Sequence, residues 1–410
     1  MRPHPAAAVL AGGRFQKLGL ETNRRLLALA PLRLPPRRVA AVAAGVAVAA
    51  AWVRGVSSRR LRRPCGRATL TNVTAHAATG PCLPELSPKF RFRPSDSSFV
   101  ACLQEHGVAV LAAALTPVEV GEVVDLIWAW LECAGTGVRR HDASTWTSVD
   151  GRWPKDNSST GVVCVRGAGQ SLAAWTVRGT ATVQEAFATF WGTDELLTSM
   201  DGLILWRPWQ QKPRGILEPW RTRGGWLHLD QNIGKRPGLE ALQGLAALTA
   251  AEPASTGGFV CVPGSHRPEV SRVLAPRFGP NLRKRGDFLA LPEGDPLWRE
   301  AVAVPLRPGD LALWDSRLLH ASEPAPGEEG GVAARRPPAC SPDLLRLAVP
   351  VCMVPRARAL EPEALAAWRA EAVRRGVTTK HWPHRQRVQG EPAGAGYEPP
   401  KLTLAMQRML

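Results

Sequence analysis

Residues 225–232 read GWLHLDQN, and this motif is the most informative one in the chain. Residues 226–230 alternate in the way that predicts a β-strand, with His228 and Asp230 on one face and the two leucines on the other. An imidazole and a carboxylate two residues apart on one strand face can bind the same metal ion. The motif His-x-Asp alone is weak evidence, because it also occurs often by chance. A metal site of this kind also needs a third ligand from elsewhere in the chain.

The best candidate for that ligand is His320, which ends the segment PGDLALWDSRLLH at residues 308–320. Two histidines and one carboxylate on one face of an ion form the facial triad of non-heme Fe(II) oxygenases, which leaves coordination positions open for a cosubstrate and O₂. The chain contains no Walker A, Gly-x-Ser-x-Gly or Cys-x-x-Cys motif that would point to a different reaction. We therefore expect His228, Asp230 and His320 to bind iron and to form the catalytic centre.

Three other segments follow the motif: GGFVCVPGSH at residues 257–266, residues 309–320, and RLAV at residues 346–349. In this order and spacing the four segments resemble the phytanoyl-CoA dioxygenase family of Fe(II)/2-oxoglutarate-dependent oxygenases, and the similarity extends over residues 97–385. The resemblance implies a double-stranded β-helix, which is a jelly roll with the iron at its mouth. It also implies that the ion is held by His228, Asp230 and His320.

The resemblance further implies an arginine that forms a salt bridge with the C5 carboxylate of 2-oxoglutarate, and Arg346 carries over to that role. A guanidinium suits the role because its planar fork matches a carboxylate through two parallel hydrogen bonds. A long insert at residues 321–345, either a lid or disordered, separates Arg346 from the distal histidine. Three other arginines are therefore alternatives: Arg317, Arg335 and Arg336. We prefer Arg346, because it alone begins a convincing strand.

Several other residues near these motifs need an interpretation. Gln231 and Asn232 directly follow the metal-binding strand, and we expect them to bind and orient the cosubstrate or the substrate. His266 is expected to shape a turn, whereas HWPH at residues 381–384 is expected to lie at the surface or in a lid. Four tryptophans are expected in the core rather than in a substrate cage: Trp175, Trp206, Trp209 and Trp226.

The distribution of strands and turns predicts a mainly β fold with flanking helices, as in a cupin-like, double-sheet jelly roll. Short strands separated by Gly/Pro turns are expected at residues 203–206, 226–230, 259–262, 301–306, 311–314 and 346–354. Helices are expected from the capping box at residues 116–119 to Leu131, at residues 183–191 and at residues 362–376. Pro350 interrupts the last strand, so we expect it at a sheet edge or a bulge.

Residues 1–84 differ in composition from the rest of the chain, and we expect the folded domain to comprise residues 85–410. The segment is rich in Ala and Arg, and its apolar run at residues 39–53 is shorter than the about 20 residues that span a bilayer. We interpret it as an organelle transit peptide for a plastid or a mitochondrion. The alternatives are a membrane anchor at residues 39–53 and a disordered basic tail. Membrane contact is expected only through residues 37–54.

The net charge of +17 does not indicate a nucleic-acid partner. Residues 1–84 contain 14 of the 52 Lys and Arg residues and one of the 35 acidic residues, which gives this segment a net charge of +13 and leaves +4 for residues 85–410. The latter show no stripe of basic and aromatic residues. The eight cysteines are scattered, several in apolar runs, which indicates small core residues in a reducing compartment rather than disulfides or a zinc site.

The sequence thus predicts an Fe(II)- and 2-oxoglutarate-dependent dioxygenase that hydroxylates a small organic substrate, such as a lipid, an acyl group or another metabolite. Succinate and CO₂ would be released, with ascorbate as the reductant. One alternative is a catalytically weak or inactive jelly-roll protein that serves as a binding or scaffold module. Another alternative is a cupin-like metal protein that does not use 2-oxoglutarate. Arg346 is the residue that distinguishes a 2-oxoglutarate-dependent dioxygenase from such a protein. The substrate itself is not identified by the fold.

Overall fold

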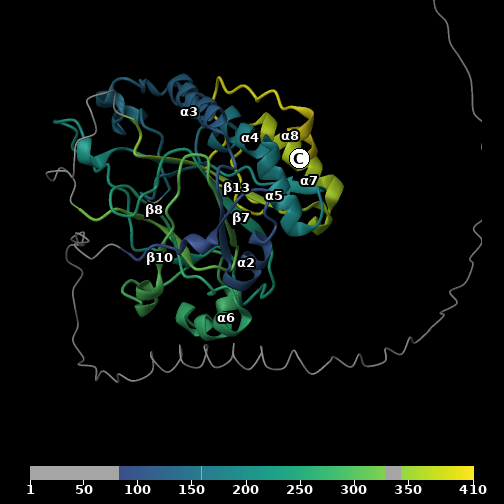
Figure 1. Ribbon diagram of the computed structural model, residues 1–410. Helices are drawn as coiled ribbons and strands as arrows, with labels where there is room; N and C mark the ends of the chain where they lie inside the picture. Colours follow the sequence, from purple (N-terminus) through teal and green to yellow (C-terminus); the bar gives the residue numbers. More distant parts are fainter. Residues whose placement is uncertain (1–82, 158, 328–342) are drawn as a thin grey trace, which may run out of the picture. The chain divides into compact units, whose positions relative to one another are not determined.

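Two β-sheets form the centre of the structure, a computed structural model that describes residues 83–157, 159–327 and 343–410 (Figure 1). The large sheet has the strand order β1 (Arg91–Phe92), β2 (Val108–Leu111), β11 (Leu311–Asp315), β7 (Leu242–Ala247), β13 (Arg346–Pro355), β5 (Leu203–Trp206) and β3 (Val162–Val163), and β4 (Leu196–Thr198) also pairs with β13. The small sheet has the order β10 (Val302–Ala303), β8 (Gly257–Cys261), β12 (His320–Pro324), β6 (His228–Leu229) and β9 (Leu289–Ala290).

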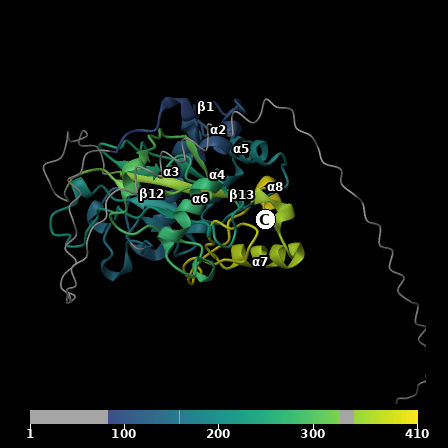
Figure 2. The same cartoon turned by 90° about the horizontal axis from the view of Figure 1, so that it is seen from below.

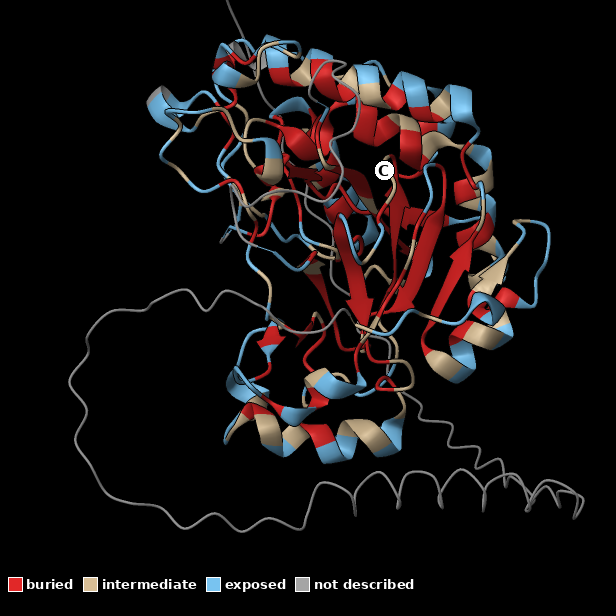
Figure 3. Ribbon diagram, turned by 60° about the vertical axis from the view of Figure 1, so that its left-hand side comes forward, coloured by how far each residue is buried: buried red, intermediate tan, exposed pale blue. Residues whose placement is uncertain are grey.

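The two sheets face each other, as expected for a jelly roll. Trp314 of β11 in the large sheet lies with its ring centroid 5.3 Å from that of His320 in the small sheet, and 4.6 Å from that of Phe259 of β8. The strands of both sheets are largely buried (Figure 3). The predicted mainly β fold with flanking helices is therefore confirmed, and the space between the sheets is where a ligand can be enclosed.

The described residues also form α-helices, several of which contact the large sheet. They are α2 (Phe99–His106), α3 (Pro117–Leu131), α4 (Leu172–Gly179), α5 (Ala181–Trp191), α6 (Pro268–Leu274), α7 (Pro362–Arg374) and α8 (Leu404–Arg408). The predicted capping box is present at the start of α3, where Thr116 and Glu119 exchange hydrogen bonds. Both α4 and α5 contact β13, and Phe187 of α5 packs against Gly244 of β7. The C-terminal helices α7 and α8 lie close together (Figure 2).

Pro350 lies inside β13 in the middle of the large sheet, and not at an outer edge or a bulge as expected. On one side, β13 pairs with β7 from Ala348 to Met353. On the other side it pairs with β5 up to Ala348 and with β4 from Met353 onward. The backbone of Cys352 bonds to Ser199 on this second side, so the alternation of the strand directs the nitrogen of Pro350 into the gap between β5 and β4. Proline is tolerated there because no N–H is needed.

Of the described cysteines, Cys164, Cys261 and Cys352 are buried as expected for core residues, whereas Cys102 is half-buried and Cys133 is exposed. None of the helices that the structure describes is both long and apolar enough to cross a membrane. The predicted transit peptide with its apolar run, up to residue 82, lies outside the described residues. So do residues 328–342 of the predicted insert, and the predictions about these segments stay predictions.

Candidate active site

The three expected metal ligands converge between the two sheets. His228 is the first residue of β6, Asp230 follows that strand directly, and His320 opens β12. The Asp230 carboxylate oxygens lie 3.4 Å from Nε2 of His228 and 3.3 Å from Nε2 of His320. One ligand atom from each of the three residues lies within 4.8 Å of the others, a separation that one ion can bridge.

Both histidines are held in the tautomer that suits metal binding. Nδ1 of His228 lies 3.1 Å from the carbonyl oxygen of Trp226, and Nδ1 of His320 lies 2.9 Å from that of Leu318. A carbonyl oxygen only accepts hydrogen bonds, so each Nδ1 carries the proton. Each Nε2 is left with a free lone pair that points toward Asp230, as in protein metal sites whose histidines are oriented by their outer nitrogen.

The protonation states of the site also suit a divalent cation. Burial lowers the pKa of His228, and the neighbouring imidazole of His320 lowers it further. Burial alone would raise the pKa of Asp230, but the imidazoles of His381, His228 and His320 hold that pKa well below its usual value. A neutral imidazole and an ionised carboxylate are the forms that bind a metal ion. These residues therefore fit Fe(II).

Two aromatic rings pack against the imidazole of His228. The ring of Trp226 stacks on His228 with centroids 4.7 Å apart and an interplanar angle of 12°, and Phe288 contacts the same imidazole at 4.6 Å. Trp175, Trp206 and Trp209 are buried as expected, but Trp226 is only half-buried and lines the cavity at the metal ligands. The core prediction thus fails for Trp226.

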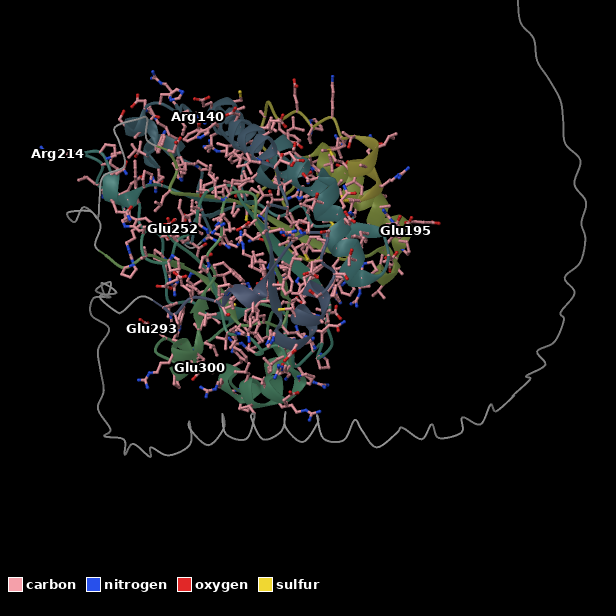
Figure 4. The ribbon with its side chains drawn as sticks, in the orientation of Figure 1. Arg140, Glu195, Arg214, Glu252, Glu293 and Glu300 are labelled. Atoms are coloured by element: carbon pink, nitrogen blue, oxygen red, sulfur yellow. The ribbon has the colours of Figure 1, made fainter. Side chains whose placement is uncertain are left out.

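The triad lines a cavity of about 370 Å³ between the sheets. Its wall combines aromatic side chains, such as Phe259 and Phe288, with polar groups that include Asp201 and His381. In contrast, charged residues such as Glu195, Arg214 and Glu300 lie at the periphery of the fold (Figure 4). Charged groups inside the cavity therefore stand out, because burying a charge is costly unless the site uses it.

Two residues of this site were not expected from the sequence. Nε2 of Gln243, on β7, donates a 2.8 Å hydrogen bond to Oδ2 of Asp230. Nδ1 of His381 lies 3.8 Å from Oδ2 of the same carboxylate, and its Nε2 lies 3.3 Å from the Asp230 carbonyl oxygen. Gln243 sits in a strand that has no motif, and His381 comes from a distant segment, so only the fold reveals that both contact a metal ligand.

Arg346 is the first residue of β13 and is almost completely buried, with 2% of its surface exposed. Its Nη1 donates a 2.9 Å hydrogen bond to Oγ of Ser322, a residue that lines the cavity. The guanidinium stands over the ring of Trp206 at 4.6 Å, and burial lowers its pKa to about 9. Nη2 has no hydrogen-bond partner, and within the described ranges no carboxylate lies within 4.0 Å of this cation.

The described alternative to Arg346 is engaged elsewhere. Arg317 forms two hydrogen bonds with the carboxylate of Asp315, at 2.9 and 2.7 Å, and a third with the carbonyl oxygen of Pro237. Its guanidinium is therefore already paired. The other two candidates, Arg335 and Arg336, lie outside the described residues.

Gln231 and Asn232 do not line the cavity, which corrects the role expected for them. The Gln231 amide donates to the carbonyl oxygens of Arg236 and Gly238 and accepts from Ser316 and Glu240. The Asn232 amide donates to three carbonyl oxygens of residues 282–286 and accepts from two backbone N–H groups. Both are fully buried and have their polar atoms satisfied, so they fix the loop that follows the metal ligands.

The remaining histidines divide into two groups. His266 is buried in a turn with Nε2 3.2 Å from the carbonyl oxygen of Gln104, as expected for a structural residue. The HWPH segment, in contrast, does not lie at the surface as expected. His384 is buried with Nε2 3.5 Å from the Glu240 carboxylate, and His381 lines the cavity.

Comparison with known proteins agrees with this geometry. The model of the phytanoyl-CoA dioxygenase (PhyH) family matches residues 103–328, more than half of the chain. The chain belongs to the phytanoyl-CoA dioxygenase family. Ava biosynthesis cluster protein O of Aspergillus versicolor is 28% identical over 289 residues, which cover 68% of this chain and 84% of that protein.

The chain is also similar to chains of solved structures. A protein of Salmonella typhimurium LT2, proposed to be an oxidoreductase, aligns with a TM-score of 0.51 at 14% identity and covers 90% of this chain and 91% of its own. EctD from S. alaskensis, solved with 2-oxoglutarate and 5-hydroxyectoine, aligns with a TM-score of 0.41 at 17% identity over 68% of this chain and 85% of its own. Family and site together support a non-heme iron oxygenase.

Proposed function

We propose that the protein is an Fe(II)- and 2-oxoglutarate-dependent dioxygenase that hydroxylates a small organic substrate, a lipid, an acyl group or another metabolite. His228, Asp230 and His320 would hold the iron, and Arg346 would bind the C5 carboxylate of 2-oxoglutarate. When bound, Fe(II) would allow O₂ to oxidise both ligands: 2-oxoglutarate would lose CO₂ and take up one oxygen atom to become succinate, and the substrate would gain the other oxygen atom as a hydroxyl group. Ascorbate would serve as the reductant that keeps the iron as Fe(II).

The observation that carries this proposal is the unpaired guanidinium of Arg346. Leaving a buried cation without a counter-charge is strongly unfavourable. Nη1 and Nη2 present a planar fork, of which Nη2 has no partner in the described structure. An anionic ligand that enters the cavity completes this arrangement, and a carboxylate matches the fork.

The other side chains of the site have defined tasks in the proposed reaction. The carbonyl oxygens of Trp226 and Leu318 keep the two imidazoles aimed at the ion. Gln243 holds Asp230, so that the carboxylate keeps one orientation. The buried rings of Phe259 and Trp314 form an apolar part of the cavity wall beside His320, which would keep water away from the reactive centre.

The decisive experiment measures 2-oxoglutarate binding and turnover with the full chain. We expect the wild type, loaded with Fe(II) without oxygen, to bind 2-oxoglutarate with a visible charge-transfer absorption, and to release succinate when O₂ and ascorbate are added. Arg346→Ala should raise the 2-oxoglutarate concentration needed for half-saturation by about 10- to 100-fold, because hydrogen bonds to a charged group contribute about 1.5–3 kcal/mol. The half-saturating 2-oxoglutarate concentration of Arg346→Lys should lie between those of the wild type and Arg346→Ala, because lysine keeps the positive charge but lacks the planar fork of the guanidinium.

Arg317→Ala is the matched control, because this arginine is already paired with Asp315, and its affinity for 2-oxoglutarate should equal that of the wild type. A wild-type chain that bound iron but not 2-oxoglutarate would refute the proposal, as would an unchanged affinity in Arg346→Ala. If Arg335→Ala or Arg336→Ala produced the loss instead, the anchoring role would belong to the insert. If the wild type bound iron and 2-oxoglutarate but released no succinate, the result would favour an inactive binding module.

We also propose that residues 1–84 act as an organelle transit peptide. The support is their composition, with 14 Lys and Arg residues against one acidic residue. A fluorescent protein fused behind residues 1–84 should accumulate in a plastid or a mitochondrion. A membrane-bound signal that depends on residues 39–53 would favour the anchor instead, and a diffuse cytosolic signal would refute both.

A further inference from the structure

Asp201 is a second carboxylate in the cavity, and the proposed mechanism does not use it. It lies in residues 199–202, which connect β4 and β5, and 8% of its surface is exposed. It lines the same cavity as the three metal ligands. Its carboxylate accepts one hydrogen bond, 2.7 Å from Oγ of Ser199, and in the part of the chain that the structure describes no cationic nitrogen lies within 4.0 Å of it.

A purely structural role, in which Asp201 neutralises the buried Arg178, does not account for this position. The guanidinium of Arg178 donates to the backbone carbonyl oxygens of Gly169 and Asp201, at 2.7 and 2.8 Å, and not to the carboxylate. The two charges therefore attract each other only at a distance. The hydrogen-bonding capacity of the carboxylate is left for whatever occupies the cavity, because a carboxylate can accept several hydrogen bonds and this one accepts only one within the described structure.

Two of the buried charged residues, Asp201 in the cavity lining and Arg346 beside the cavity residue Ser322, lie at opposite ends of β5. Asp201 precedes this strand by two residues, whereas Trp206, its last residue, pairs with Arg346 across the ladder. Five residues of extended chain span about 16 Å at 3.3 Å per residue. The guanidinium of Arg346 attracts an acidic cosubstrate to its end of β5, whereas the carboxylate of Asp201 repels an acidic ligand from the other end. A ligand with a positive group is favoured at the Asp201 end, so the two charges sort two ligands.

The wall of the cavity that contains Asp201 is partly apolar beside the metal ligands. The rings of Trp226 and Phe288 flank His228, and Phe288 is 53% exposed, so an apolar surface faces the cavity beside the metal ligands. The exposed cations Lys380 and Arg223 line the cavity too, but neither lies within 4.0 Å of the Asp201 carboxylate. They are therefore not its partners.

We propose that Asp201 binds a positively charged amino group of the primary substrate, while the apolar part of that substrate lies against Trp226 and Phe288. The substrate class is thus a small amine with an apolar body. This inference rests on the proposed oxygenase function for its meaning, but binding at Asp201 itself requires neither iron nor 2-oxoglutarate. The two ideas can therefore be tested separately.

The test uses three probes of one shape with different charges: benzylamine, benzyl alcohol and benzoate. Their dissociation constants are measured by calorimetry on the metal-free full chain. We expect benzylamine to bind at least fivefold more tightly than benzyl alcohol, and benzoate to bind most weakly. Asp201→Asn should abolish the preference for the amine, because it keeps the shape and removes the charge. Phe288→Ala should weaken benzylamine and benzyl alcohol alike and leave the preference in place.

The matched control is Asp287→Asn, which removes a cavity-lining carboxylate that already pairs with Arg236, and this variant should retain the preference for benzylamine. Equal binding of the amine and the alcohol in the wild type would overturn the proposal, even if Asp201→Asn failed to fold. A preference that survived in Asp201→Asn, or that was lost only in Asp287→Asn, would overturn it too. Separate titrations with Fe(II) and 2-oxoglutarate show whether the proposed oxygenase function stands when this inference falls.

Discussion

His320 lies directly opposite His228 in the antiparallel pairing of β12 with β6, and the centroids of the two imidazole rings are 4.3 Å apart. Directly opposed side chains on one face of a sheet have Cβ atoms about 4.5–5.5 Å apart, so strand pairing alone brings these two ligands to one ion. Each ring is also fixed by a backbone carbonyl oxygen. The site is thus preorganised by the ladder of the small sheet before any ion binds.

The first prediction concerns this histidine pair. His320→Ala should lower the affinity for Co(II), used as a spectroscopic substitute for Fe(II), by at least about 100-fold, because one of three ligands is lost. The visible absorption of Co(II) during titration measures the effect. His266→Ala is the matched control, since His266 is equally buried but bonds to Gln104 away from the cavity, and it should bind Co(II) like the wild type. Comparable losses in both variants would mean that the effect is not specific to the site.

The second prediction concerns Gln243, which orients Asp230 through a 2.8 Å hydrogen bond. Gln243→Leu should reduce metal affinity by about 10- to 100-fold, which is the usual effect of removing a group that orients a ligand. A competition titration against a chelator measures it. Gln170→Leu removes a similarly buried amide that bonds to Trp175 and Val377, and it should lower stability without changing metal affinity. Unchanged affinity in Gln243→Leu would show that the packing around Asp230 suffices.

The third prediction concerns pH. Contact with His384, and after it the hydrogen bond from Arg385, lower the pKa of Glu240 to about 2 against the effect of burial, from a usual value of 4.5. Because the folded pKa is the lower one, the ionised carboxylate stabilises the fold fully above pH 4.5, and this contribution disappears as the pH falls toward 2. Below pH 4.5 we expect the amide hydrogens of the HWPH segment to lose protection against exchange, measured relative to their intrinsic exchange rate at each pH. Glu240→Gln should remove this pH dependence, and identical profiles for variant and wild type would contradict the assignment.

The fourth prediction concerns Asp310, a buried carboxylate at the start of β11. It accepts hydrogen bonds from Arg91 at 2.7 Å and from the backbone N–H groups of Ala113 and Arg307 at 3.1 and 2.6 Å. Asp310→Ala should reduce the free energy of unfolding by about 2–4 kcal/mol, because three donors lose their acceptor. Urea denaturation measures it. Asp96→Ala removes an exposed carboxylate and should cost less than about 1 kcal/mol, so a similar loss in both would contradict the burial argument.

The metal ligands could be predicted from the sequence because local alternation and residue chemistry determine them. His228 and Asp230 share a face even though β6 comprises two residues and not the five expected. The motif that contains His320 ends at the first residue of β12. Arg346 begins β13 as expected, and the helix after the capping box at Thr116 ends at Leu131. In each case a few neighbouring residues contain the whole signal.

The failures arise where long-range contacts decide. Gln231 looked suited to the cosubstrate because it follows the ligands, but loop carbonyl oxygens satisfy its amide. His381 looked like a surface residue because its segment is basic and proline-containing, yet it contacts Asp230. No sequence pattern indicates that Gln243 contacts Asp230, because a glutamine in an apolar strand has many possible partners. Such roles depend on which segments the fold brings together, and a single sequence does not encode that pairing locally.

The gap at Pro350 has a consequence for how this enzyme scaffold tolerates change. Residues 199–202 cross that gap, and Pro350 cannot donate a ladder hydrogen bond to them. A substitution of the Asp201 side chain therefore removes no hydrogen bond of the pairing between β13 and β7. The charge of the cavity wall at position 201 can therefore be redesigned without breaking a ladder hydrogen bond of the large sheet.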